Sequence, residues 1–80
     1  MPRIKDIPGR YRLFFYSFDC NEPKHVHVRR ETMVCKFWLE SIELAANHGF
    51  TARELNTIRR HVRAHVGRIT EAWHEHCGSH

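Results

Sequence analysis

Residues 25–39 have the sequence His-Val-His-Val-Arg-Arg-Glu-Thr-Met-Val-Cys-Lys-Phe-Trp-Leu, in which apolar side chains take every second place over two runs. Successive side chains of a β-strand point to opposite faces, so this alternation predicts two strands, 25–30 and 33–39. Glu31-Thr32 lies between them as a tight turn, which makes the pair an antiparallel hairpin. The first strand carries its two valines on one face, and the opposite face carries His25, His27 and Arg29.

An aromatic segment precedes this hairpin. Residues 10–18, Arg-Tyr-Arg-Leu-Phe-Phe-Tyr-Ser-Phe, favour a strand with aromatic side chains on both faces. Such a strand is either central in its sheet or has one face against a partner. Residues 42–46 are too few for periodicity to separate a strand from a helical turn, and we favour a strand.

The C-terminal part of the chain predicts one long helix. Thr51 and Glu54 have the spacing of a capping box, and the helix is expected to run from there to about His76. Apolar residues recur at helical spacing on a single stripe, which consists of Leu55, Ile58, Val62, Val66, Ile69 and Trp73. We expect this stripe to pack on the sheet, with Gly67 marking a bend or a close contact.

These elements predict an α+β fold, in which a small antiparallel sheet of three to four strands packs against one long C-terminal amphipathic helix. The length of 80 residues suits a single domain, 1–80. We divide it into an N-terminal segment 1–9, a sheet 10–46, a helix 51–76 and a disordered tail 77–80.

The composition excludes some classes of protein. No stretch approaches the roughly 20 apolar residues of a membrane span, and the first ten residues lack the apolar core of a signal peptide. Cys20, Cys35 and Cys77 are an odd number of cysteines at wide spacing, which favours reduced thiols over a disulfide scaffold. We therefore expect a soluble cytoplasmic protein that does not contact a membrane.

The two histidines of the first hairpin strand are the candidate catalytic pair, about 6.8 Å apart by the rise of a strand. In metal-independent RNA cleavage a neutral imidazole accepts the 2′-hydroxyl proton, a protonated one serves the leaving oxygen, and a cation stabilises the phosphorane. His25, His27 and Arg29 are assigned to these roles, which makes ribonuclease activity one hypothesis. The alternative is that exposed strand positions simply tolerate histidine.

An excess of basic side chains gives the chain a formal charge of +4, from 13 lysine and arginine residues against nine acidic ones. This excess favours an RNA or DNA phosphate backbone or an acidic protein partner. The candidate nucleic-acid-binding residues are Lys24, Arg30, Lys36, Arg53, Arg60 and Arg63. A charged helix back is also the ordinary solvated face of a helix, and the sequence carries no RNA-recognition motif, helix-turn-helix pair or Gly-rich phosphate loop.

The remaining histidines leave metal binding open. His61 and His65 are four residues apart, a spacing at which two imidazoles share one ion, and further ligand types gather at the C-terminal end as His74, His76, Cys77 and His80. Packing beside the core and helix-end electrostatics are the alternative roles of these two groups. No spacing of a known zinc motif occurs, so we assign no metal site and no cofactor.

The element Glu22-Pro23-Lys24-His25-Val26-His27-Val28, followed by a hairpin, Asn47-x-Gly49-Phe50, a capped helix and Trp73, resembles the domain of unknown function 4160 family of short bacterial proteins. Members of this family often carry a second proline before the first histidine, where this chain has Lys24, and a further histidine upstream, where it has Cys20-Asn21. They are commonly encoded beside another small protein, in an arrangement that resembles toxin and antitoxin pairs. The resemblance therefore implies a small antitoxin-like partner protein.

Three hypotheses for the function remain open. The first is that the protein is one component of a two-protein toxin-antitoxin-like module. In this hypothesis it acts on nucleic acid, and ribonuclease activity is one form that the action could take. The second is a non-enzymatic interaction or regulatory protein, in which residues 10–18 and Trp38 contact a partner or form a homodimer. The third is a histidine-based metal-binding module.

Overall fold

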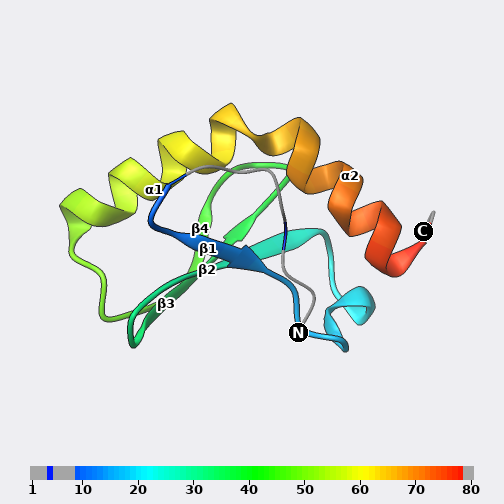
Figure 1. The fold of residues 1–80 in the computed structure, drawn as a ribbon, viewed down its shortest axis with the longest axis horizontal. Coiled ribbons are helices and arrows are strands. Elements are labelled where there is room, and N and C mark those ends of the chain that lie inside the picture. The colour runs from blue at the N-terminus through cyan, green and yellow to red at the C-terminus, as the bar shows by residue number, and fades with distance from the viewer. Residues whose placement is uncertain (1–3, 5–8, 79–80) are drawn as a thin grey trace.

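The computed structural model of the protein describes Ile4 and residues 9–78. Its elements, in chain order, are β1 (Arg12–Phe14), the short 3-10 helix η1 (Asp19–Asn21), β2 (His25–Arg30), β3 (Met33–Trp38), β4 (Leu44–His48), α1 (Ala52–Ala64) and α2 (Val66–Cys77). The four strands form one antiparallel sheet in the order β1-β2-β3-β4 (Figure 1). The predicted α+β class with a small antiparallel sheet is therefore confirmed.

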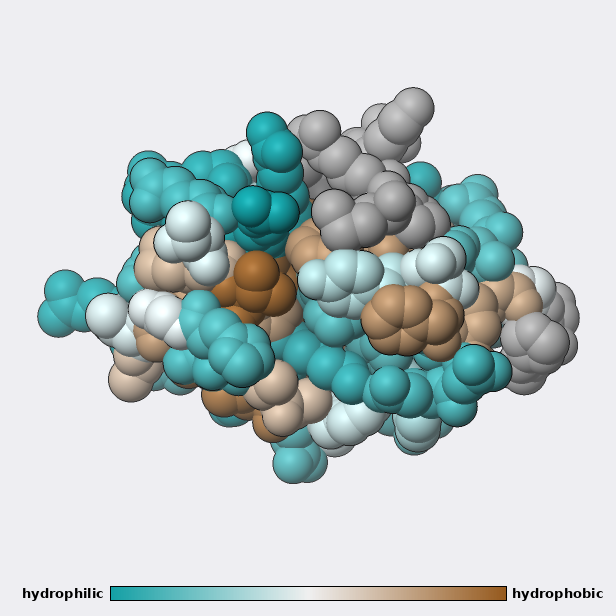
Figure 2. Space-filling view, turned by 90° about the horizontal axis from the view of Figure 1, so that it is seen from below, coloured by the Kyte–Doolittle hydropathy of each residue, from teal (hydrophilic) through white to brown (hydrophobic). Residues whose placement is uncertain are grey.

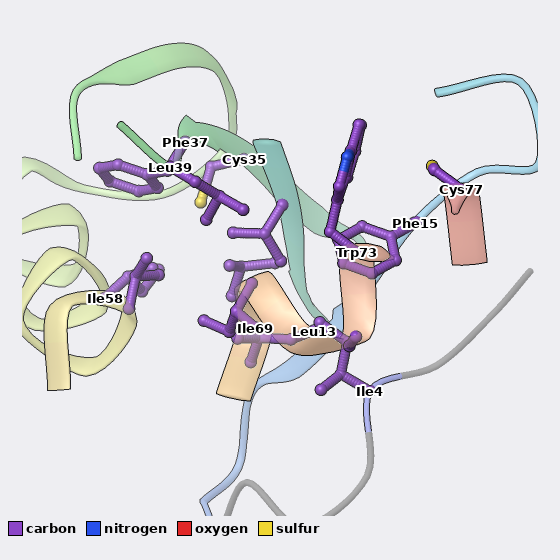
Figure 3. Close-up of a cluster of buried hydrophobic side chains, with 14 of the residues drawn as sticks. Ile4, Leu13, Phe15, Cys35, Phe37, Leu39, Ile58, Ile69, Trp73 and Cys77 are labelled. Carbon is purple, nitrogen blue, oxygen red and sulfur yellow. The ribbon is translucent and has the colours of Figure 1, made fainter. Parts of the chain in front are cut away.

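Helices α1 and α2 form an arch over one face of the sheet, and we call the opposite face, which neither of them covers, the uncovered face (Figure 1). The core lies between the sheet and the arch. Near α1 it contains Phe37, Leu39 and Ile58, and near α2 the ring of Phe15 meets that of Trp73 edge to face at 5.4 Å (Figure 3).

The alternation of β2 follows the predicted pattern. Val26 and Val28 are completely buried in the core, opposite Phe37 and Cys35 of β3. Because neighbouring side chains of a strand point to opposite faces, the histidines and Arg29 of β2 lie on the other side of the sheet. The same rule places Leu13 of β1 toward the helices.

Three strands differ in their limits from the prediction, and β3 does so only by ending at Trp38. The strand expected at 10–18 is only three residues long, because Asp19 turns the chain: its carboxylate accepts the backbone N–H of Tyr16 at 2.8 Å, and its own N–H donates to the Tyr16 carbonyl. Residues 42–46 do contribute a strand, but β4 begins later because Ile42 has a φ of 55°, outside the extended region.

The single long C-terminal helix was a wrong prediction, since the structure has two helices that meet at His65. The backbone of His65 leaves helical geometry (φ −115°, ψ 17°). Its ring Nδ1 donates to the carbonyl of His61 at 3.0 Å and so competes for a helical acceptor. Gly67, a poor helix former, follows two residues later. The predicted capping box of Thr51 and Glu54 is confirmed.

Cys20 and Cys77 are joined in a disulfide, which corrects the expectation of reduced thiols. The bond ties η1 to the last residue of α2, with a sequence separation of 57 residues. Spacing along the chain could not indicate it, because the two cysteines meet only after α2 has crossed the sheet. Cys35 remains a free, buried thiol.

The ends of the chain are described only in part. Of the N-terminal segment 1–9, Ile4 and Gly9 are described, and the backbone N–H of Ile4 donates to the carbonyl of Leu13. Of the expected disordered tail 77–80, Cys77 belongs to α2, and residues 79–80 lie outside the described residues. Among the helices of the described residues, none has the length and apolar character to cross a membrane.

Candidate functional site

Three polar side chains converge at the start of β2. One carboxylate oxygen of Asp19, Oδ2, lies 3.2 Å from Nε2 of His25 and 3.1 Å from Nε2 of His27. Asp19 comes from η1 and the two histidines come from β2, so the turn after β1 carries the carboxylate back to the strand. The side chains of Asp19 and His25 are 3 % and 0 % exposed, and that of His27 is 12 % exposed.

The tautomer of His25 follows from its other ring nitrogen. Nδ1 lies 2.7 Å from the carbonyl oxygen of Pro23, and a carbonyl only accepts, so Nδ1 carries the hydrogen. In the neutral ring the lone pair is then on Nε2, facing Asp19. The contacts of both histidines with Asp19 lack the alignment of hydrogen bonds, and neither Nε2 has a hydrogen-bond partner among the described residues.

His27 lies between aromatic rings on the uncovered face. Its ring stacks on Phe14 at 5.4 Å and meets Tyr16 edge to face at 4.7 Å. Burial lowers the pKa of His27 below its ordinary 6.5, and the negative charge of Asp19 offsets this only in part. His27 is therefore mainly neutral at pH 7.

The two histidines differ in their access to solvent. His27 lines a hollow of about 170 Å³ on the uncovered face together with Tyr16, Val34, Cys35, Lys36, Ala46 and His48. His25 is packed between the rings of Trp38 and Trp73 and is closed off from solvent. A large substrate on this face can therefore approach His27 but cannot touch His25.

A larger, open pocket of about 510 Å³ lies where β1 begins and β2 ends, at the other end of these strands from Asp19. We call it the arginine pocket, because it is lined by four arginines and one acidic residue: Arg10, Arg12, Arg29, Arg30 and Glu31. Arg12 is paired across the two strands with Arg29, so their side chains leave the sheet on the same face. Nε of Arg29 donates to the backbone carbonyl of Glu31, and Arg30 forms an ion pair with Glu54 of α1 at 3.5 Å.

The other predicted nucleic-acid-binding residues are divided between two surfaces. Lys36 contacts Glu22 at 2.6 Å, and its ammonium lies 4.5 Å from the ring centre of Trp38. Lys24 precedes β2 and is half-buried. The predicted arginines of α1 are exposed, belong to the helical layer and do not line the arginine pocket: Arg53, Arg60 and Arg63.

The predicted metal-binding histidines of α1 and α2 lie in packing positions or in the last helical turn, and His80 lies outside the described residues. The rings of His61 and His65 lie 4.6 Å apart, and His61 also meets Tyr11. Burial, together with the neighbouring His65, lowers the pKa of His61. His76 stacks on Phe15 and contacts the carbonyl of Tyr16 through Nε2, and His74 lies in the last turn of α2.

The comparison with protein families identifies a match over most of the chain. The model of the family described as Domain of unknown function (DUF4160) matches residues 11–74. The chain belongs to the DUF4160 family. No match was found among curated proteins or among solved structures.

The DUF4160 match extends from the residue before β1 into α2 and includes the cluster of Asp19, His25 and His27. Sequence analysis missed Asp19 and Arg12 as site residues. The position of Asp19 six residues before His25 was visible, but the 3-10 turn that brings it back was not. Arg10 and Arg12 were visible as two basic residues at strand spacing. The pairing of Arg12 with Arg29 depends on the register of β1 on β2, and the loop between these strands gives no indication of that register.

Proposed function

We propose that this DUF4160 protein is the nucleic-acid-directed component of a two-protein toxin-antitoxin-like module, that it acts in the cytoplasm, and that it binds single-stranded RNA on the uncovered face of its sheet. The observation that carries the proposal is the arginine pocket at the end of β1 and β2. Reduced cysteines were one reason for expecting a cytoplasmic protein, and the disulfide removes that reason. The proposed cytoplasmic location therefore follows only from the proposed toxin-antitoxin-like module.

The charges of the arginine pocket favour an anion. Four guanidinium groups line it with a single carboxylate, that of Glu31. On the helical side, Arg30 contacts the carboxylate of Glu54 at 3.5 Å, a long distance for an ion pair. Guanidinium groups present a planar fork of donors that matches a phosphate, and they keep their charge at every physiological pH. A phosphate of a nucleic-acid backbone therefore fits this pocket by charge and by donor geometry.

Aromatic side chains on the same side of the molecule, at the other end of β1 and β2 from the pocket, favour RNA bases. The ring of Phe18 is 65 % exposed and stacks on Tyr16 at 5.5 Å. Trp38 lies further along the same face beside Lys36. Single-stranded nucleic acids bind where aromatic rings stack on bases and basic groups hold phosphates. Figure 2 shows this side of the molecule, on which brown apolar side chains alternate with teal hydrophilic ones.

A protein partner is the second candidate, supported by the same exposed Phe18. A large apolar ring with this exposure is a common anchor of an interface. A homodimer through residues 10–18 has less support, because the N–H of Ile4 already donates to Leu13 on β1, an edge strand of the sheet. Phe18→Ser is expected to abolish complex formation with the co-encoded protein in size-exclusion chromatography if this partner site exists.

The RNA proposal is tested by fluorescence anisotropy with a labelled single-stranded RNA over a range of salt concentrations. We expect Arg12→Ala with Arg29→Ala to weaken binding at least tenfold. Each lost phosphate contact lowers the slope of log K against log salt by about 0.7, so the slope falls by about 1.4. The matched control is Arg60→Ala with Arg63→Ala, which removes the same charge from α1.

Equal weakening by the two double variants would show a nonspecific effect of net charge and would overturn the assignment of the pocket. Cleavage of the same RNA is followed on a gel in parallel. The assignment of His25, His27 and Arg29 to catalysis stays a prediction, and cleavage that survives His27→Ala would contradict it.

A further inference from the structure

The cluster of Asp19, His25 and His27 has the features of a metal site, and we propose that it binds one divalent transition-metal ion of the Zn²⁺ or Co²⁺ type. The ligands would be Oδ2 of Asp19 and Nε2 of each histidine. These three atoms lie within 4.8 Å of one another. The inference does not depend on RNA binding, and it differs from the histidine groups that the sequence indicated.

The distances from Asp19 Oδ2 to the two histidine nitrogens suit an ion that binds all three atoms. Bonds of about 2.0 to 2.1 Å put neighbouring ligand atoms of an octahedral or tetrahedral ion about 2.8 to 3.4 Å apart. The two distances from Asp19 Oδ2, 3.2 and 3.1 Å, fall in this interval. Two imidazoles and one carboxylate are a common ligand set for Zn²⁺ and for Fe²⁺ in proteins.

The surrounding backbone already orients two of the ligands. The Pro23 carbonyl accepts the Nδ1 hydrogen of His25 at 2.7 Å, which leaves the lone pair of Nε2 for an ion. The N–H of Tyr16 donates to Asp19 Oδ2 at 2.8 Å. Metal-binding histidines almost always donate their other ring hydrogen in this way, and metal-binding carboxylates are themselves hydrogen-bonded.

The cluster is poorly satisfied without a cation. Both Nε2 atoms are buried and lack hydrogen-bond partners among the described residues. The lone pair of His25 Nε2 faces a carboxylate oxygen, and two acceptors in contact repel each other. Leaving a buried polar atom unpaired costs about 1 to 3 kcal/mol, so an ion between these atoms would remove a real penalty. The unpaired Nε2 of the fully buried His25 is the strongest single indication of a ligand.

An ion in this position would lie beside the uncovered face. His27 and Tyr16 also line the hollow of about 170 Å³, so a fourth coordination position can face that hollow. The proposal conflicts with metal-independent RNA cleavage, because an imidazole whose lone pair binds a metal cannot accept a proton. Asp19 then acts as a ligand, and His25 needs no contact with solvent.

The test measures metal binding by the whole chain with its disulfide intact, after removal of bound metal with a chelator. Equilibrium dialysis gives the stoichiometry and affinity for Zn²⁺, and Co²⁺ gives visible d–d bands that report its coordination. We expect one ion per chain with a Kd in the micromolar range or below. Asp19→Asn, which keeps an acceptor for Tyr16, and His27→Gln should each weaken binding at least tenfold and reduce the Co²⁺ bands.

Two paired substitutions serve as controls. His61→Gln with His65→Gln removes the pair on α1, and His74→Gln with His76→Gln removes the C-terminal pair; both should leave the affinity within twofold. The group of Cys20, His76 and Cys77 also lies close together, but its two sulfurs are joined to each other. Far-UV circular dichroism checks folding, and His27→Gln decides the question if Asp19→Asn unfolds. An absence of stoichiometric binding, or equal affinity in wild type and folded His27→Gln, would overturn the proposal.

Discussion

Asp19 is a buried carboxylate that contacts groups from two segments of the chain. Its carboxylate accepts a hydrogen bond from the Tyr16 N–H, and this turn follows the end of β1. The same carboxylate contacts the imidazoles of His25 and His27 in β2. It is almost completely buried, and buried carboxylates are retained where they are paired, hydrogen-bonded or bound to a metal. One side chain thus links the local turn to the histidine cluster.

His61 makes stability depend on pH. Its pKa is lowered in the folded protein by burial and by His65, whereas the unfolded chain has a histidine pKa near 6.5. As pH falls below about 6.5, the unfolded state takes up the proton first, so stability is lost. We expect the urea midpoint to fall less between pH 7.5 and 5.5 in His61→Gln than in wild type. The same fall in both proteins would contradict this, and the exposed His48→Gln is the control.

The thiol of Cys35 is a second residue with a defined expectation. Burial raises the pKa of Cys35 to about 12, so almost no thiolate forms near neutral pH. With Cys20 and Cys77 paired, the folded chain should take up no iodoacetamide, the unfolded unreduced chain one group, and the unfolded reduced chain three. Mass spectrometry counts the groups, and labelling of three cysteines without a reductant would exclude the disulfide.

At the scale of elements, the clearest patterns were predicted best. The alternation of His25 to Arg30 gave β2 with its correct limits, and Thr51 with Glu54 gave the start of α1. The aromatic residues of 10–18 predicted a strand that is too long. Their high strand propensity continues beyond Phe14, where β1 ends and the chain turns toward Asp19. Local propensity is overruled here by one side-chain hydrogen bond.

The sequence indicated the break between α1 and α2 less clearly than it indicated β2 or the start of α1. Gly67 indicated a bend, but the helix is interrupted two residues earlier, where the His65 ring bonds to the His61 carbonyl. The apolar stripe continues through the break, since Val62 and Ile69 are both fully buried. Periodicity therefore predicted which face packs on the sheet without revealing that the helix is divided.

At the scale of the whole molecule, the candidate sites depend on contacts between distant segments. Arg12 meets Arg29 only through the register of β1 on β2, and Cys20 meets Cys77 only after the chain has crossed the sheet. Sequence periodicity contains neither kind of information. The His-x-His element and the positive charge were visible from the residues, whereas the convergence of the two histidines on Asp19 required the fold.

The central claim is that the uncovered face, and not the helical layer, binds RNA. Titration of the ¹⁵N-labelled protein with a short single-stranded RNA, followed by NMR, tests it directly. We predict that shifted signals map to β1 and β2 and include the side-chain Nε–H groups of Arg12 and Arg29. Shifts confined to α1, at Arg53, Arg60 and Arg63, or an absence of shifts at saturating RNA, would contradict the account.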